Sequence, residues 1–163
     1  MHPNEQLLTR FYTAFASRDA ATMAACYAPG ATFEDPAFEL VGSEIGMMWK
    51  MLCENAKDDF RLEFSRIVAN DEAGSAHWEP RYTFSASGRR VHNIIDSSFV
   101  FKDGLIIAQE DKFSFWRWAS QALGAPGLLL GWLPMMRGKV RTQADKNLAA
   151  FIAKQKRLAQ NQA

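Results

Sequence analysis

The sequence predicts an α+β fold in which three N-terminal helices pack on one face of a curved antiparallel sheet, followed by a C-terminal helical extension. Apolar residues first recur with helical spacing, and beyond residue 58 they alternate with polar residues as in half-buried strands. Helices and strands that are segregated along a chain in this way are typical of the α+β class. The 163 residues, 48% of them hydrophobic and 23% charged, suffice for one domain with a substantial core.

Three helices are expected in the N-terminal part, with a short extended segment between the second and the third. Residues 4–17 carry one apolar face, which indicates an amphipathic helix. Asp19 can cap a second helix that reaches Tyr27, where an Ala-Pro-Gly turn ends it. A short strand is expected to begin at Ala31 and to run as far as Asp35, whose backbone is extended because it precedes a proline. Ser43 can cap the third helix.

Four strands are expected next, arranged as an antiparallel meander. The first contains the alternating residues 60–65 and is followed by a turn at 70–72. The other three are expected at residues 75–84, 89–101 and 105–116, joined by two Gly-containing hairpin turns.

The C-terminal part combines an apolar segment with a basic helix. No charged residue occurs from Trp118 to Met136, but three Gly and two Pro interrupt this segment. We therefore expect a lid, a dimer contact or an interfacial loop rather than a membrane span. A basic helix is expected over residues 139–160. Residues 1–117 are interpreted as the main body and residues 118–163 as an extension of the same domain.

Charge is unevenly distributed along the chain. Residues 1–113 hold 11 Lys/Arg and 17 Asp/Glu, or −6, and residues 114–163 hold 8 and 1, or +7, which together give the net charge of +1. We expect the basic part to pack on the acidic body; the alternative is attraction to a membrane surface or another anionic partner. A net charge this small argues against nucleic acid as a partner, since that would require a broad basic face.

The cysteines and the N-terminus indicate a cytoplasmic location. Cys26 and Cys53 are too few for a disulfide framework and are interpreted as small buried side chains in a reducing compartment. Residues 1–6 are polar and show no apolar signal segment.

Two sequence segments carry a resemblance to a known family. The chain resembles the nuclear transport factor 2-like superfamily in the order of its expected helices and strands and in two segments. These are YAPGATFEDP at residues 27–36 and SGRR…IIDSSFVFKDGLI at residues 87–106. The superfamily has the cone-shaped α+β fold of ketosteroid isomerase, scytalone dehydratase and the SnoaL-like polyketide cyclases. The resemblance covers residues 4–115, and the whole chain is similar to an uncharacterised SnoaL-like branch. It implies a cone-shaped domain and a homodimer formed through the outer face of the sheet.

The resemblance also implies roles for individual residues. The aspartate that acts as base in the isomerase falls on Asp35, while its oxyanion-binding tyrosine and protonated aspartic acid fall on Phe11 and Ser97. Tyr12 is adjacent to the first of these positions, and Asp96 is adjacent to the second but on the opposite face of the strand. Because two of the three positions differ, we do not expect a true ketosteroid isomerase.

Alternation along the strands then predicts an apolar pocket with a few polar groups, the usual character of small-molecule sites. Asp35 and Asp111 are the candidate catalytic pair, because two carboxyls in an apolar cavity repel each other and at least one pKa should rise. The alternative is that Asp111 pairs with Lys112 or Arg117 while Asp35 caps a turn. The candidate substrate-binding residues are Tyr12, Trp49, Trp78, Tyr82, Asn93, Ser97, Phe99, Gln109 and Phe113. A one-residue bulge would exchange Ser97 with Asp96 and Asp111 with Glu110.

Polar residues on the opposite strand faces allow two interpretations. His77, His92 and Asp96 include residue types that bind zinc, but their spacing matches no metal motif. We expect instead a network at the dimer interface in which Arg81 pairs with Asp96 or Glu79. No metal and no cofactor are expected.

The predicted function is a cofactor-independent enzyme of the isomerase, cyclase or lyase type that acts on a small hydrophobic carbonyl or polycyclic compound. Asp35 and Asp111 would exchange protons with the substrate, while Asn93 and Ser97 would hydrogen-bond a developing oxyanion. Two alternatives stay open: a non-catalytic module that binds a lipophilic small molecule, and a membrane-surface protein that uses residues 123–136.

Overall fold

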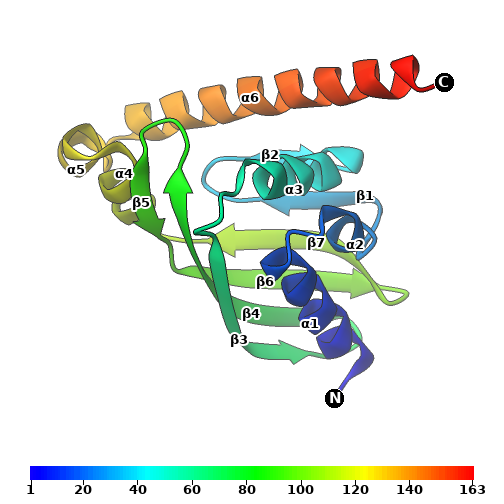
Figure 1. Cartoon of the computed structure of the whole chain (residues 1–163). Coiled ribbons are helices and arrows are strands. Elements are labelled where there is room, and N and C mark those ends of the chain that lie inside the picture. The colour runs from blue at the N-terminus through cyan, green and yellow to red at the C-terminus, as the bar shows by residue number, and fades with distance from the viewer.

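A strongly curved sheet of seven strands forms the centre of the computed structural model, which describes residues 1–163 (Figure 1). The strands in chain order are β1 (Tyr27–Glu34), β2 (Glu39–Val41), β3 (Arg61–Ala69), β4 (Ala73–Phe84), β5 (Arg89–His92), β6 (Ile95–Lys102) and β7 (Leu105–Lys112). Across the sheet their order is β2-β1-β7-β6-β4-β3, and β5 pairs with β4 beside this path.

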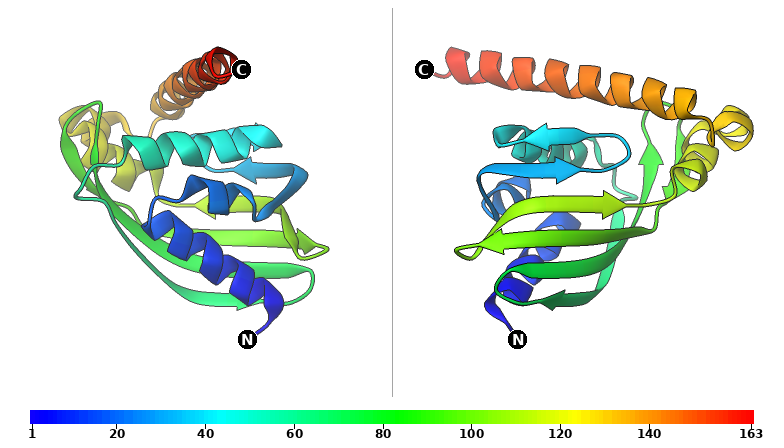
Figure 2. Two further views of the ribbon diagram at one scale, coloured as in Figure 1. Left: turned by 45° about the vertical axis from the view of Figure 1, so that its right-hand side comes forward. Right: turned by 180° about the vertical axis from the view of Figure 1, so that it is seen from behind.

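Three helices fill the concave side of this sheet (Figure 2). They are α1 (Pro3–Ala16), α2 (Ala20–Ala24) and α3 (Ser43–Asn55). Three more helices follow the last strand: α4 (Phe115–Leu123), α5 (Ala125–Leu130) and the long α6 (Pro134–Asn161). The structure therefore confirms an α+β fold with a curled, unclosed sheet, N-terminal helices on one face and a helical C-terminal extension.

The expected four-stranded meander is incomplete, because the segment after α2 joins the sheet. The short strand expected from Ala31 to Asp35 is present as β1 but begins earlier, at Tyr27, which was expected to end a helix; β1 runs parallel to β7, with Phe33 opposite Gln109. The short β2 then pairs antiparallel with β1. The helix ends at Ala24, before the Ala-Pro-Gly sequence, which lies inside β1, and this extended backbone finds its hydrogen-bond partners on a strand far away in sequence.

Smaller differences occur at the ends of elements. The strand expected over 89–101 is divided into β5 and β6 at Asn93 and Ile94. The strand expected over 105–116 ends at Lys112, because Ser114 caps α4 by accepting a hydrogen bond from the backbone N–H of Arg117 at 3.2 Å. Ser43 is the first residue of α3 rather than its cap; Gly42 occupies the cap position at a φ of 65°, which favours glycine.

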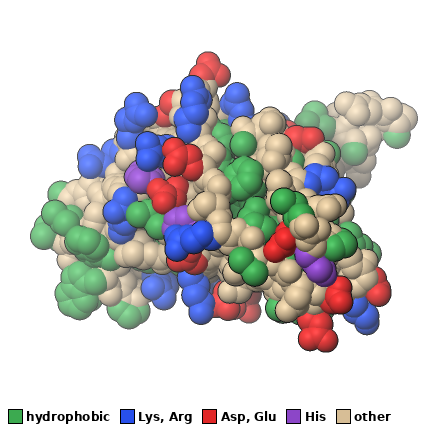
Figure 3. Space-filling model, turned by 90° about the horizontal axis from the view of Figure 1, so that it is seen from below, with side chains coloured by type: hydrophobic (Ala, Val, Ile, Leu, Met, Phe, Trp, Pro, Cys, Tyr) green, Lys and Arg blue, Asp and Glu red, His purple; other side chains and the backbone are tan.

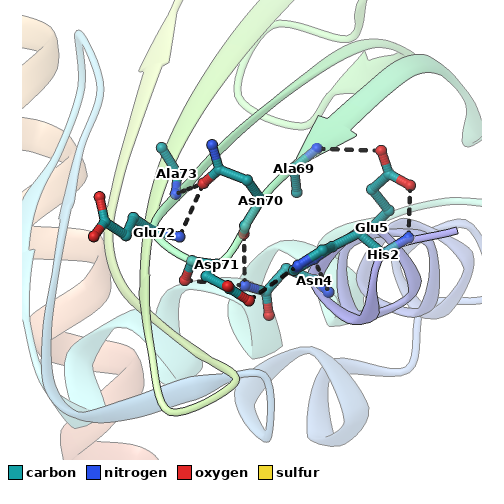
Figure 4. A network of polar contacts seen from close by, with 8 residues as sticks. All are labelled: His2, Asn4, Glu5, Ala69, Asn70, Asp71, Glu72 and Ala73. Carbon is teal, nitrogen blue, oxygen red and sulfur yellow. Dashed lines mark hydrogen bonds and ion pairs between the residues drawn. The ribbon is translucent and has the colours of Figure 1, made fainter.

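The start of α1 is tied to the turn between β3 and β4 (Figure 4). The side-chain amide of Asn4 donates to the backbone carbonyl of Asn70 at 2.9 Å, and the His2 ring contacts the Asp71 carboxylate at 3.1 Å. The side chain of Asn70 in turn accepts from the backbone N–H groups of Glu72 and Ala73. These contacts fix the open edge strand β3 against the first helix.

Aromatic side chains fill the space between the helices and the sheet. Phe11 from α1 contacts Trp49 from α3 with ring centroids 5.7 Å apart, and Trp49 in turn lies 6.4 Å from Trp78 on β4. Leu148 of α6 belongs to the same buried cluster, so the extension packs on the main body. An ion pair between Arg141 and Glu39 at 3.5 Å adds to this contact. None of the helices combines the length and the apolar character that crossing a membrane requires.

Candidate active site

The parallel pairing of β1 with β7 brings Asp35 and Asp111 together. Phe33 lies opposite Gln109 and Glu34 opposite Glu110, so Asp35 and Asp111 come next on the two neighbouring chains. Side chains alternate between the two faces of a strand, and neighbouring strands are only about 5 Å apart. Both carboxyls therefore belong to the inner face, beyond the end of the β1–β7 ladder.

Asp111 is a buried carboxyl with one oxygen held and one oxygen free. Its Oδ1 accepts hydrogen bonds from the hydroxyl of Ser97 at 2.5 Å and from the side-chain amide of Gln109 at 2.9 Å. Its Oδ2 accepts none from the protein, and the residue is only 3% exposed. Burial raises the pKa of Asp111 to about 7 against the two hydrogen bonds, and the charge of Asp35 raises the pKa further.

The hydroxyl of Ser97 is held by two aromatic residues. It accepts hydrogen bonds from the indole N–H of Trp78 at 2.8 Å and from the hydroxyl of Tyr12 at 3.2 Å. With its own proton donated to Asp111, the Ser97 oxygen has every hydrogen-bonding position used. Its orientation is therefore fixed, and Asp111 is fixed with it.

A second chain of hydrogen bonds orients Gln109. The indole N–H of Trp49 donates to the hydroxyl of Tyr27 at 2.9 Å, and this hydroxyl donates to the side-chain oxygen of Gln109 at 2.5 Å. The amide group of Gln109 must then present its NH₂ to Asp111. The buried network thus has Asp111 at its centre, and only Oδ2 of that carboxyl is left without a protein partner.

Asp35 is a half-buried carboxyl that caps a tight turn. Its Oδ1 accepts from the backbone N–H groups of Ala37 and Phe38, both at 2.7 Å, as is usual where Asp precedes a turn. Its Oδ2 has no hydrogen-bond partner in the protein. Burial raises the pKa of Asp35 to about 6, since the loss of solvation outweighs the two backbone hydrogen bonds and the positive charge of Arg141.

Half-buried aromatic side chains belong to the same region as the pair. The hydroxyl of Tyr82 accepts a hydrogen bond from the indole N–H of Trp118 at 3.0 Å. Burial raises the pKa of Tyr82, and the negative charge of Asp35 raises it further. Phe113 is also half-buried and lies two residues after Asp111, directly past the end of β7.

The other predicted binding residues are buried in the core. Tyr12, Trp49 and Phe99 are at most 2% exposed and contact one another or their aromatic neighbours. Asn93 is 4% exposed and accepts the backbone N–H of Ile94 at the bend between β5 and β6. A surface hollow of about 880 Å³ lies between α2, β1 and α3, and neither Asp35 nor Asp111 lines it. Contact of these core residues with a substrate therefore stays a prediction.

The residues of β6 and β7 that face the core are those that the sequence predicts. Ser97 and Asp111 are 2% and 3% exposed, whereas Asp96 and Glu110 lie on the outer face. Lys112 contacts Glu110 at 3.5 Å, so the alternative pairing of Lys112 with Asp111 is wrong.

The predicted pairing of Arg81 on the outer face is also wrong. His77 contacts Asp96 at 2.7 Å and Glu79 at 2.9 Å, and His92 contacts the second oxygen of Glu79 at 2.7 Å. The two histidines thus take up the carboxylates of Glu79 and Asp96, one contact running along β4 and two crossing to neighbouring strands, and neither carboxylate pairs with Arg81. Hydrogen bonds to Glu79 and then to Asp96 raise the pKa of His77. This group does not have the arrangement of a metal site.

Two site residues were missed in the sequence. Tyr27 was expected at the end of a helix, and only the β1–β7 pairing places its hydroxyl beside Gln109. Trp118 was not among the predicted site residues, and its contact with Tyr82 depends on α4 starting at Phe115. The Ser114 cap is the signal that predicts this helix.

The comparisons with known proteins identify the same fold. The model of the SnoaL-like domain family matches residues 8–109. No curated protein is similar to the chain in sequence. An epoxide hydrolase of M. tuberculosis, described as LEH-like, is 19% identical with a TM-score of 0.62, and the match covers 78% of this chain and 92% of that one.

Two further solved structures are similar. A hypothetical protein of Catenulispora acidiphila with a ketosteroid isomerase-like fold, in complex with trimethylamine, is 14% identical with a TM-score of 0.63, over 78% of this chain and 97% of that one. TsrD of Streptomyces laurentii is 21% identical with a TM-score of 0.62, over 75% and 96% of the two chains. At these identities the structures establish the fold, and the family model covers more than half of the chain. The chain belongs to the SnoaL-like domain family.

Proposed function

We propose that the chain is a cofactor-independent enzyme that moves a proton on a small hydrophobic carbonyl compound, with isomerisation, cyclisation or elimination as the outcome. One observation carries this proposal. Asp35 and Asp111 share the inner face, and each has one oxygen held by hydrogen bonds and the other without a protein partner. Two such carboxyls provide a general base and a general acid that need no further group.

The two environments give the carboxyls different roles. Asp35 has the lower pKa, about 6, and is the group that loses its proton first. Asp111, with a pKa of about 7, keeps its proton longer. Because Oδ1 of Asp111 already accepts two hydrogen bonds, the proton belongs on Oδ2. Pairs of titratable groups with separated pKa values are the usual arrangement for acid–base catalysis near neutral pH.

The proposed step is proton transfer next to a carbonyl group. Oδ2 of Asp35 removes a proton from the carbon beside the carbonyl, and the electron pair of the C–H bond forms the enolate. Oδ2–H of Asp111 donates a hydrogen bond, or its proton, to the oxygen on which the negative charge develops. Return of the proton from Asp35 to a different carbon, together with return to Asp111 of any proton that it gave to the oxygen, completes an isomerisation and restores both carboxyls.

The neighbouring residues act through this pair. Ser97 and Gln109 are positioning residues, since their donors hold Oδ1 of Asp111. Tyr82 and Phe113 provide the apolar walls nearest to solvent, and Asn93 remains a predicted oxyanion contact. The similarity to a structure described as an epoxide hydrolase supports an enzymatic use of this fold.

A non-catalytic binding module is the second candidate. The aromatic residues behind the carboxyls are tightly packed, and a structure of similar fold holds trimethylamine. In that function the carboxyls would only position or balance the charge of a small ligand.

Hydrogen exchange distinguishes the two candidates. We would incubate the protein in deuterated water with a panel of enolisable hydrophobic ketones and follow deuterium uptake by NMR. Asp35→Asn should abolish exchange while ligand line broadening persists, and Glu34→Gln, the outward neighbour on β1, should leave both unchanged. Binding without exchange in the wild type would support the binding module, and exchange that survives Asp35→Asn would overturn the assigned base.

The pH dependence of exchange provides a second test. Activity should rise as Asp35 ionises near pH 6 and fall as Asp111 loses its proton near pH 7, which gives a narrow bell. Since the two carboxyls interact, the apparent pKa values of the two limbs of the bell describe the pair of carboxyls rather than either residue alone. A rate that keeps rising above pH 8 would contradict the acid role of Asp111.

A further inference from the structure

An exposed apolar corner is present where the C-terminal extension turns back over the body. Its large hydrophobic side chains are Leu128 (53% exposed), Leu129 (67%), Leu130 (40%), Trp132 (70%), Met135 (57%) and Trp116 (44%). Hydrophobic side chains gather at the left end of Figure 3, the end where Figure 1 places α5. A contiguous patch of this kind on a protein surface is typical of an interaction site.

The corner is held rigidly by its own backbone. Gly127 of α5 lies so close to α4 that a Cβ at this position would stand 1.9 Å from the carbonyl oxygen of Ala119. The glycine side of α5 therefore packs on α4, and Leu128 and Leu129 are left facing solvent. The indole N–H of Trp132 donates to the carbonyl of Leu129 at 3.0 Å, and that of Trp116 to the carbonyl of Leu128 at 3.1 Å. Both rings can thus enter an apolar medium without an unpaired donor.

The two chain segments that border the corner carry basic residues and no acidic ones. No Asp or Glu occurs in residues 80–95, which include the β4–β5 hairpin, or in residues 112–144. These two segments hold eight cations, Arg81, Arg89, Arg90, Lys112, Arg117, Arg137, Lys139 and Arg141, of which Lys112 contacts Glu110 and Arg141 contacts Glu39. Hydrogen bonds place the hairpin beside the corner, since the Arg89 guanidinium donates to the carbonyl of Gln121 at 2.8 Å. Lys and Arg side chains border the hydrophobic group in Figure 3.

We propose that this corner docks the protein on the surface of an anionic lipid bilayer. Tryptophan and leucine would enter the boundary between headgroups and acyl chains, and the surrounding cations would contact the anionic headgroups. A second copy of the chain fits less well. A two-fold contact places the same patch on both partners, so the cations of one copy would face those of the other. This proposal rests on the surface alone and is independent of the proposed enzymatic function.

The test is flotation of the full-length chain with vesicles of phosphatidylcholine alone and with an equal amount of phosphatidylglycerol. We expect binding to the mixed vesicles that weakens as salt rises from 0.1 to 1 M, because the Debye length falls from about 10 Å to about 3 Å. Replacing Leu129 and Trp132 together by Ser should weaken partitioning about 100-fold, since each buried side chain contributes at least tenfold. Brominated lipid should quench Trp fluorescence in the wild type and much less in Trp132→Phe.

Charge variants provide a matched control within one chain. Arg90→Glu with Lys139→Glu removes two exposed cations at the corner and should weaken binding at least 25-fold, about fivefold for each cation lost. Lys156→Glu with Arg157→Glu makes the same change at the far end of α6 and should have little effect (Figure 1). Circular dichroism and the melting temperature verify that each variant is folded.

Three outcomes would overturn the proposal. The first is no flotation with the mixed vesicles at low salt. The second is an equal loss of binding in the two pairs of charge variants. The third is a concentration-dependent dimer that the Leu129 and Trp132 variant converts to a monomer, without vesicle binding by either; this would assign the corner to a second copy of the chain.

Discussion

Replacing Asp111 by Asn should make the stability of the protein less sensitive to pH. The pKa of this buried carboxyl is raised from 3.8 to about 7 in the folded chain. The native state therefore binds the proton more tightly than the unfolded state, and stability falls as pH rises from about 4 to about 7. Asparagine carries no proton that titrates in this range, so the stability of the Asp111→Asn variant lacks this dependence on pH.

The size of the effect follows from the shift. Three pH units at 1.36 kcal/mol each give about 4 kcal/mol of stability lost by the time Asp111 is ionised. Of this, about 3 kcal/mol is lost between pH 5 and pH 8, because the unfolded carboxyl is already ionised at pH 5. For a chain of this length that corresponds to about 6–12 °C in melting temperature.

The assay is thermal unfolding at pH 5 and pH 8. The melting temperature of Asp111→Asn minus that of wild type should be about 6–12 °C higher at pH 8 than at pH 5. For Glu110→Gln, the outward neighbour on β7, the same difference from wild type should be equal at both pH values. Stability curves of wild type and Asp111→Asn that stay parallel from pH 5 to pH 8 would refute the reasoning, because they would mean that burial does not disfavour the ionised carboxyl.

Two further predictions concern the network and the corner. Ser97→Ala should destabilise the protein by about 1–3 kcal/mol, because buried donors and an acceptor lose their partner, whereas Ser98→Ala on the outer face should change stability by less than about 0.5 kcal/mol in urea unfolding. Gly127→Ala should cost about 3 kcal/mol, since its Cβ would collide with the backbone of Ala119. Gly138→Ala, which meets no neighbour in α6, should instead gain about 1 kcal/mol from helix propensity. Equal effects of the two glycine substitutions would contradict the close packing of α5 on α4.

Much of the fold could be predicted because its signals are local. The apolar face of residues 4–17 matches α1, and the alternation around Phe64 matches β3. The parity of β6 was also correct, since a period of two leaves only two choices and Ser97 fits the buried one. The Lys102-Asp103-Gly104 turn is where the structure has it, with both Asp103 and Gly104 at positive φ.

Long-range pairing explains what could not be predicted. Parallel pairing of β1 with β7 joins segments about 75 residues apart and leaves no periodic signal in either of them. The roles of Tyr27 and Gln109 depend on this pairing. The histidine network on the outer face likewise depends on which cross-strand side chain reaches a carboxylate first, and His77 reaches Asp96 across the β4–β6 pair.

The hydrogen bonds around Asp111 support the proposed acid role over a structural one. Ser97 and Gln109 both donate to Oδ1, and the carbonyl oxygen of an asparagine would accept both bonds without the loss of about 4 kcal/mol that an ionised carboxylate brings above pH 7. The hydrogen-bond network therefore does not require a carboxyl. What asparagine cannot do is hold and release a proton on the oxygen that has no protein partner, beside Asp35. An Asp111→Asn variant that gains stability and loses exchange would separate these two properties in a single protein.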